Sequence, residues 1–301
     1  MIVVHGGAGR IGPERHARMR SGCLAAARVG HAILVAGGTA LDAAIAAVRV
    51  LEDDPEYNAG TGAVLTREQT VETDAAVMDG RTQRVGAVAA VPNMGRAIDV
   101  ARAVLDDGEH VLLAGTAALT FATERGIAQA PLDSLITERA RQRFAEESAR
   151  RQRGVAATST VREGGTVGAV AMDRAGNFAA ATSTGGIVYK RTGRVGDSPI
   201  PGAGTWADVR IAVSVTGDGE AVLRVALAHQ IAMRVSLSGA SLAGAVAASL
   251  ADLKAITAGD AGVIAIDRHG PVIVHTTPTM PTAWIDDTGE HDEIDRFATQ
   301  R

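Results

Sequence analysis

Aromatic side chains are scarce in this sequence: they make up 3% of its 301 residues, whereas hydrophobic residues make up 46%. Alanine, valine, leucine and glycine must therefore fill most of the interior. Small side chains let backbones approach one another closely, which is typical of packed layers of sheet and helix. The length is ample for a buried core in one large domain or two small ones.

Cysteine is nearly absent. The single residue, Cys23, cannot form a disulfide within the chain or supply a thiolate cluster for a metal. The eight histidines include no i, i+4 pair and no HExxH motif. The sequence therefore predicts no metal centre built from side chains, and it favours a reducing, cytoplasmic setting.

Long apolar runs and basic stripes are also lacking. No stretch of about 18 apolar residues occurs, and residues 1–20 have no continuous apolar segment of the kind that a signal peptide requires. The net charge is −4, and the densest basic run, residues 139–153, is interleaved with Glu and Gln. We expect neither a membrane span nor a nucleic-acid partner, and we interpret 139–153 as a solvated helix or linker. The acidic tail, residues 286–295, is interpreted as a solvated end.

The glycines that are present raise a question near the N-terminus. In VVHGGAGRIG, Gly7, Gly9 and Gly12 have the spacing of a dinucleotide-binding loop. Pro13 is placed to open a helix. The dinucleotide fold also needs an acidic residue about 20 positions on, at the end of a second strand. Residues 19–41 contain no Asp or Glu and have a helical pattern, so a tight strand-to-helix turn is favoured. A nicotinamide oxidoreductase stays as an alternative from another class.

Hydrophobic periodicity predicts how the chain is organised. Thr39 is placed to cap the second of the predicted helices. Residues 149–165 have no periodicity and few large apolar groups, so we interpret them as a linker. Hairpins with helices at both ends predict antiparallel sheets covered by helical layers rather than a doubly wound parallel sheet. Helices are predicted at 13–36, 39–51, 98–105, 111–125, 136–148 and 220–235. Strands are predicted at 2–5, 85–91 and 211–216, with a further strand beginning at Val64. Two hairpins are predicted, within 166–184 and 262–275.

The end of this linker offers a candidate nucleophile. Gly165 and Thr166 stand directly before a β-branched, alanine-rich strand. A threonine freed at its amino terminus carries both a nucleophilic hydroxyl and a base, because an α-amine has a pKa of about 7.7–8.0. Without such cleavage, ordinary strand propensity explains Thr166.

Polar groups further along the chain could serve such a nucleophile. Residues 183–186 (STGG) and 216–219 (TGDG) carry hydroxyls and backbone amides that could donate hydrogen bonds to an oxyanion. Arg194 and Asp197, three apart in GRVGDSP, could bind the carboxylate and the ammonium of an amino acid. A surface ion pair is the alternative explanation of that pair.

Five motifs together resemble those of one family. VVHGGAG, YNAGTGAVL, GTVGAVAMDRAGNFAAATSTGG, GRVGDSPIPGAG and TGDGE occur in order and are similar to motifs of the plant-type (type III) L-asparaginases, which are also isoaspartyl dipeptidases. These proteins are N-terminal-nucleophile hydrolases. The resemblance implies an α+β fold, a four-layer αββα sandwich of two antiparallel sheets flanked by helices. It also implies one domain over 1–301 that cleaves itself into an α subunit, 1–165, and a β subunit, 166–301.

The resemblance implies a role for each matching residue. Cleavage would fall between Gly165 and Thr166, and we expect the turn His5-Gly6-Gly7 to help position that bond. The implied catalytic residues are Thr166 (nucleophile and, through its amine, base), Thr184 (partner of its hydroxyl), and Thr216 and Gly217 (oxyanion hole). The implied substrate-binding residues are Arg194 for the α-carboxylate, Asp197 for the α-ammonium, Gly219 through its backbone, and Asn58 near the nucleophile.

Cofactors and partners follow from the same resemblance. It implies no catalytic cofactor, a structural sodium ion held by main-chain carbonyls, and small-molecule substrates, namely L-asparagine and β-aspartyl dipeptides. A dimer of αβ heterodimers is the usual assembly. The segment DSPIPGAG also resembles the glycosylasparaginases, but this sequence has STGG where they usually have STNG. An uncleaved, inactive binding protein is the remaining alternative. The implied sodium ligands are the carbonyls of Leu51, Glu52, Asp54, Tyr57, Ala59 and Thr61.

Overall fold

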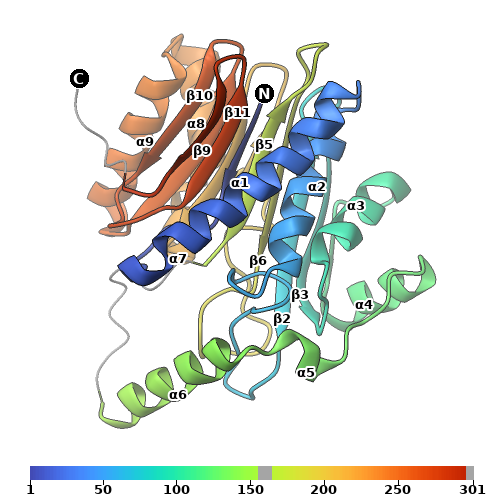
Figure 1. The fold of residues 1–301 in the computed structure, drawn as a ribbon, viewed down its shortest axis with the longest axis vertical. Coiled ribbons are helices and arrows are strands. Elements are labelled where there is room, and N and C mark those ends of the chain that lie inside the picture. Colours follow the sequence, from blue (N-terminus) through green and yellow to red (C-terminus); the bar gives the residue numbers. More distant parts are fainter. Residues whose placement is uncertain (155–164, 296–301) are drawn as a thin grey trace.

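In the computed structural model, which describes residues 1–154 and 165–295, two β-sheets lie face to face between outer layers of helices (Figure 1). Their strand orders are β12-β11-β1-β5-β6-β2-β3-β4 and β10-β9-β8-β7. The predicted four-layer α+β sandwich is thus confirmed, although the edge pair β3 and β4 is parallel. The larger sheet comprises β1 (Ile2–His5), β2 (Glu72–Asp79), β3 (Arg84–Pro92), β4 (Leu112–Ala114), β5 (Val167–Met172), β6 (Phe178–Thr184), β11 (Thr282–Asp286) and β12 (Gly289–Glu293). The smaller sheet comprises β7 (Thr205–Ala207), β8 (Ala212–Gly217), β9 (Ala261–Asp267) and β10 (Gly270–His275).

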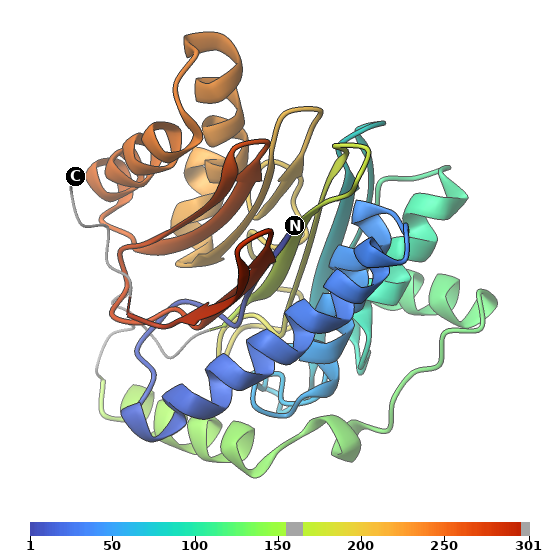
Figure 2. The same cartoon turned by 45° about the horizontal axis from the view of Figure 1, so that its top comes forward.

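Helices α1 (Pro13–Val35), α2 (Ala40–Asp53) and α3 (Ala97–Asp107) cover the outer face of the larger sheet (Figure 2). As predicted, Thr39 caps α2, its hydroxyl accepting a hydrogen bond from the backbone N–H of Asp42 at 3.1 Å. The nearly continuous apolar surface of α2 packs on β5 and β6, where alanines allow close approach. The other helices of this half are α4 (Gly115–Glu124), α5 (Leu132–Leu135) and α6 (Glu138–Gln152).

The central strands are buried on both faces. Along β5 and β6, Ala169 and Ala181 face the helices, whereas Val170 and Phe178 face the smaller sheet. This alternation follows from the two-residue period of a strand. The molecule therefore has an apolar layer between its sheets as well as one beneath each helical layer.

Helices α7 (Gly219–Val225), α8 (Leu227–Ser238) and α9 (Leu242–Thr257) cover the smaller sheet. The single helix predicted for 220–235 is wrong, because Ala226 has a φ of 49° and ends α7. The next turn is held by the neighbouring loop: the backbone N–H groups of Ala228 and His229 donate to the carbonyls of Ala203 (3.1 Å) and Gly202 (2.8 Å). Helix α9 was not predicted.

Two other predictions fail in the first half of the chain. Instead of one helix over 111–125, β4 pairs with β3, and Gly115, with a φ of 62°, leads into α4. No strand begins at Val64; its backbone N–H donates to Asn58 Oδ1 at 2.8 Å within a loop. Strand β2 was not predicted either, because its charged residues mask the strand pattern.

The acidic tail is not a solvated end. Its residues form part of β11 and all of β12, which pair from Thr282 opposite Glu293 to Asp286 opposite Gly289. Arg28 of α1 forms an ion pair with Glu290 at 2.6 Å. The predicted linker also begins too early, since α6 runs on to Gln152; residues 155–164 of that linker lie outside the described residues.

Candidate active site

Three strand ends meet at one cavity. Thr166 immediately precedes β5, Thr184 ends β6, and Gly217 ends β8. The cavity has a volume of about 450 Å³, which lies within the range of about 300–1,000 Å³ typical of small-molecule sites. Tertiary structure thus brings together residues that lie some 50 positions apart in sequence. The predicted site residues that line the cavity are Gly165, Thr166, Thr184, Arg194, Asp197, Gly217 and Gly219.

The candidate nucleophile is nearly buried. Thr166 is 7% exposed, and its hydroxyl lies 3.3 Å from Ser198 Oγ. Thr184 Oγ1 accepts a hydrogen bond from the backbone N–H of Gly186 at 2.9 Å. Sequence reasoning missed Ser198, although it directly follows Asp197 in GRVGDSP. Ser198 is therefore a candidate partner for the hydroxyl of Thr166, in addition to Thr184.

A buried chain of hydroxyls links His5 to the segment that carries Ser198. His5 Nε2 lies 3.0 Å from Ser214 Oγ, which lies 2.8 Å from Thr182 Oγ1. Thr205 donates from Oγ1 to the carbonyl of Ser198 at 3.0 Å and lies 2.7 Å from Thr182 Oγ1. Burial lowers the pKa of His5 to about 3, so the imidazole is neutral in this network. The contact with Ser214 therefore places the imidazole of His5 inside a buried hydrogen-bonded network at the end of β1.

The glycine turn after β1 reaches the same place. Gly7 has a φ of 102°, and the backbone N–H of Ala8 donates to Thr216 Oγ1 at 3.1 Å. A Cβ on Gly6 would lie 2.4 Å from a ring carbon of Tyr57, so only glycine fits there. The turn therefore contacts a predicted oxyanion residue through its backbone.

Asn58 connects the loop after α2 to the nucleophile region. Its Nδ2 donates to the carbonyl of Gly186 at 2.8 Å, while its Oδ1 accepts from Val64. A Cβ on Gly165 would lie 3.5 Å from Asn58 Nδ2. The amide of Asn58 thus lies next to the peptide bond that sequence reasoning predicts to be cleaved.

Arg194 and Asp197 place a cation beside an anion at the cavity wall. Burial acts to lower the pKa of the Arg194 guanidinium, but its hydrogen bonds to Glu220 and the nearby negative charges together raise it. Asp197 is 4% exposed, and burial raises its pKa to about 7 although Arg194 opposes the shift. A Cβ on Gly219 would lie 2.7 Å from Asp197 Oδ1 and 2.9 Å from Arg194 Nη2. A small ligand with one positive and one negative group fits this arrangement.

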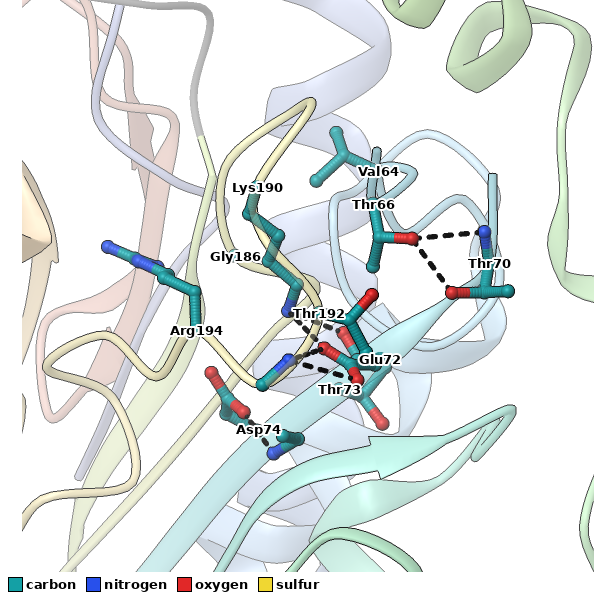
Figure 3. Close-up of polar contacts among 12 residues, drawn as sticks. Val64, Thr66, Thr70, Glu72, Thr73, Asp74, Gly186, Lys190, Thr192 and Arg194 are labelled. Atoms are coloured by element: carbon teal, nitrogen blue, oxygen red, sulfur yellow. Dashed lines mark hydrogen bonds and ion pairs between the residues drawn. The ribbon is translucent and has the colours of Figure 1, made fainter. Parts of the chain in front are cut away.

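A buried charged cluster lies behind Arg194 (Figure 3). Lys190 Nζ donates to the carbonyl of Glu72 at 3.0 Å. Asp74, also on β2, is buried beside it. None of these three residues was predicted as functional, since a single Lys, Glu or Asp carries no spacing signal.

The loop predicted to bind sodium brings carbonyls close to two glycines. A Cβ on Gly60 would lie 2.5 Å from the carbonyl oxygen of Glu52, and one on Gly62 would lie 2.7 Å from that of Tyr57. The Glu52 carbonyl also accepts a hydrogen bond from the N–H of Thr61 at 2.8 Å, which leaves it a second lone pair. Two of the six predicted carbonyls, those of Glu52 and Tyr57, thus lie against the glycines of one tightly folded loop.

Two other classes of site are not found in the described part of the chain. Within residues 1–154 and 165–295, no group of three His, Cys, Asp or Glu side chains is placed to hold a metal ion. Over the same residues, no helix is both long and apolar enough to cross a membrane.

The layered sandwich is the fold of N-terminal-nucleophile hydrolases. Residues 1–294 match the family model described as asparaginase. The chain is 45% identical over 298 residues to an isoaspartyl peptidase/L-asparaginase of Bos taurus and 43% identical to that of Homo sapiens, in each case over 98% of this chain and 96% of the relative. An isoaspartyl peptidase of Escherichia coli (strain K12) is 40% identical over 94% of this chain and 92% of its own length. The chain belongs to the asparaginase family.

Proposed function

We propose that this chain is a threonine hydrolase that cleaves β-aspartyl dipeptides and the side-chain amide of L-asparagine. The observation that carries the proposal is the position of Thr166, directly before β5 and in the same cavity as Arg194 and Asp197. Family membership and the printed activities of the relatives support it.

Activation would be self-cleavage of a single domain, 1–301, into 1–165 and 166–301. In the intact chain the nitrogen of Thr166 belongs to a peptide bond and cannot act as a base. Attack of its hydroxyl oxygen on the Gly165 carbonyl carbon would break the C–N bond, giving an ester and freeing the Thr166 amine; water would then hydrolyse this ester to the Gly165 carboxylate and restore the Thr166 hydroxyl. The contacts of Asn58 near Gly165 and of His5 near the Thr166 backbone support a positioning role for these residues.

Substrate would bind by both charges of its aspartyl group. The guanidinium of Arg194 would pair with the α-carboxylate and the carboxylate of Asp197 with the α-ammonium, while the Gly219 backbone contacts the amine. The side-chain carbonyl would then face Thr166. Since both L-asparagine and β-aspartyl dipeptides carry this group, one site serves both substrates.

The reaction would follow from the free amine. It takes the proton of the Thr166 hydroxyl, whose oxygen attacks the side-chain carbonyl carbon. Thr216 and Gly217 would stabilise the tetrahedral oxyanion as the C–N bond breaks and ammonia or an amino acid leaves. Water would hydrolyse the β-aspartyl ester to give L-aspartate and restore the hydroxyl. Thr184 and Ser198 would orient that hydroxyl throughout.

Three further properties belong to the same proposal. A sodium ion held by the predicted carbonyls, at the C-terminal end of α2 and in the loop that follows, would stiffen the segment that carries Asn58. The mature protein would be a dimer of αβ heterodimers, and its compartment would be the cytoplasm. Burial raises the pKa of the single cysteine, Cys23, to about 12, so its thiol stays protonated and unreactive. A free thiol of this kind needs no oxidising compartment, which supports a cytoplasmic location.

A denaturing gel tests the proposal. In proportion to 30.8 kDa for the whole chain, cleavage before the nucleophile gives bands of about 17 and 14 kDa, the smaller beginning TVGAV. Thr166→Ala should abolish both cleavage and hydrolysis of L-asparagine. A single full-length band after prolonged incubation, or an active Thr166→Ala variant, would contradict the mechanism.

A further inference from the structure

Lysine is unusually rare in this chain. Of its 30 basic residues other than histidine, only Lys190 and Lys254 are lysines, and the rest are arginines. The side chain of Lys254 is 53% exposed, whereas that of Lys190 is 0% exposed. A buried ammonium has a substantial desolvation cost, so its position needs a specific explanation. Its compact charge fits where the planar fork of an arginine would need more room.

The ammonium of Lys190 is held by the first residue of β2. Nζ donates to the carbonyl of Glu72 at 3.0 Å and lies 4.0 Å from its carboxylate oxygen Oε2. Both carboxylate oxygens of Glu72 in turn accept the backbone N–H of Gly193, at 3.2 and 2.9 Å. Glu72 therefore ties two points of the loop between β6 and β7 to the sheet, both in the segment that leads to Arg194 (Figure 3).

A second acid of β2, Asp74, interacts with both cations of this region. Asp74 is buried and accepts the backbone N–H of Ala90 at 2.6 Å. Burial raises the pKa of its carboxyl, while the charges of Lys190 and Arg194 both act to lower it. Burial likewise lowers the pKa of Lys190, and Asp74 and Glu72 oppose that shift. The acids of β2 thus act on the ammonium of Lys190, and Asp74 also on the guanidinium of Arg194.

Lys190 and Arg194 converge on one cavity-lining glycine. A Cβ on Gly186 would lie 3.1 Å from Lys190 Nζ and 3.4 Å from Arg194 Nη1. The backbone of Gly186 is also bonded to Thr184 and Asn58. Gly186 has a φ of 82°, so this conformation and these contacts together require glycine. The ammonium end of the Lys190–Glu72 pair therefore faces the cavity wall.

We propose that Lys190 is a positioning residue for the substrate α-carboxylate: its ammonium, anchored on Glu72, supports Gly186 and Arg194 and adds positive charge behind the carboxylate subsite. The proposal rests on the proposed function, because it assumes the same aspartyl site. In a buried setting, charges separated by several ångströms interact much more strongly than they do in water. Lys190 therefore affects substrates that carry an α-carboxylate and has little effect on the chemical step.

The test compares L-asparagine with L-asparaginamide, in which a neutral amide replaces the α-carboxylate. The variant that combines Lys190→Met with Glu72→Gln removes both charges of the pair, and the new side-chain amide oxygen at position 72 can still accept from the N–H of Gly193. We expect the KM for L-asparagine to rise about tenfold or more with kcat changed less than about threefold, and the KM for L-asparaginamide to shift less than about twofold. Lys190→Gln, which can still donate to the Glu72 carbonyl, is the second variant should the first fail to fold.

Lys254→Met is the matched control, since it removes the other lysine from an exposed position. It should leave both KM values unchanged. A folded Lys190 variant with an unchanged KM for L-asparagine, or one that loses both substrates equally, would overturn the proposal. Two measurements separate the proposed function from the role of Lys190. A wild-type protein that hydrolyses neither substrate contradicts the proposed function. Equal calorimetric affinities of wild type and variant for L-aspartate contradict the role of Lys190.

Discussion

The guanidinium of Arg194 forms a bidentate ion pair with the carboxylate of Glu220. Nε donates to Oε1 at 2.9 Å and Nη2 donates to Oε2 at 2.7 Å. Glu220 lies one residue after the predicted backbone contact Gly219, and its side chain is 58% exposed. This is the geometry with which an arginine binds a substrate carboxylate. Glu220 and an incoming α-carboxylate would therefore compete for the same donors.

Replacing Glu220 with glutamine should relieve this competition. An exposed ion pair contributes little, so we expect Glu220→Gln to lower the KM for L-asparagine about two- to fivefold with a similar kcat. Raising the ionic strength should lower the wild-type KM and leave that of the variant nearly constant, because salt screens exposed pairs. Steady-state kinetics in low and high salt measure both effects, with Glu124→Gln on α4 as a control. A higher KM in Glu220→Gln would show that this carboxylate supports binding.

The raised pKa of Asp197 predicts an acid limit to activity. Burial raises this pKa to about 7, and only the charged carboxylate pairs with a substrate ammonium. As the pH falls through about 7, the carboxylate gains a proton and kcat/KM should fall. A free threonine amine, with a pKa of about 7.7–8.0, must also lose its proton to act as a base. At low pH, log kcat/KM should therefore approach a slope of about two.

Asp197→Asn separates the two groups. It should lower kcat/KM about a hundredfold or more at neutral pH, because the substrate ammonium would lose its buried partner. Its acid limb should have a slope of about one, from the amine alone. A slope of two that persists in Asp197→Asn would mean that another group causes the second ionisation.

Glu52 should make stability depend on pH. Burial raises its pKa to about 8, against hydrogen bonds from Ser183 (2.5 Å) and from the backbone N–H of Ile98 (3.1 Å). The folded protein thus keeps a proton that the unfolded chain loses above about pH 4.5. Stability that is fully present below that pH is lost progressively as the pH rises toward 8.

Glu52→Gln removes this ionisation while it keeps an acceptor for both donors. We expect the free energy of unfolding at pH 8 to rise by about 1–3 kcal/mol relative to wild type, and the two proteins to converge near pH 4.5. Urea titrations at several pH values measure it, and Glu109→Gln, an exposed carboxyl, is the control. A wild-type stability that is flat between pH 5 and 8 would contradict the prediction.

Gly7→Ala should slow self-cleavage. The φ of 102° at Gly7 is strained for any residue with a Cβ, by about 1–3 kcal/mol. The turn would shift, and with it the contact of Ala8 with Thr216. We expect the full-length band to disappear about tenfold more slowly on a gel time course.

The matched control for this variant is Gly176→Ala, in the turn between β5 and β6. Gly176 has a φ of 77° and open space around its Cα, so it carries a similar backbone strain away from the cavity. It should mature at the normal rate. Equal rates for Gly7→Ala and wild type would argue against a role of the turn in cleavage.

Sequence reasoning succeeded where a signal is local. Thr39 caps α2 because a threonine hydroxyl satisfies an N–H three residues on, and 166–184 forms a hairpin around a tight turn. Predictions from the sequence failed where contacts with a segment distant in sequence determine the local structure. The break at Ala226 depends on bonds to Gly202 and Ala203, and β12 exists because β11 offers it an edge.

The sequence by itself determined the layered class of fold, through hairpins of small residues between helical segments, and it picked out Thr166, Arg194 and Asp197 by their chemistry and spacing. Only the tertiary structure decided which groups surround them: Ser198 beside the nucleophile, Glu220 on Arg194, and Lys190 with Glu72 behind it. The physical reason is that a hydrophobic pattern reports which face of a strand or helix is buried. A buried hydrogen bond or ion pair instead depends on two side chains that meet only when the sheets and loops have packed.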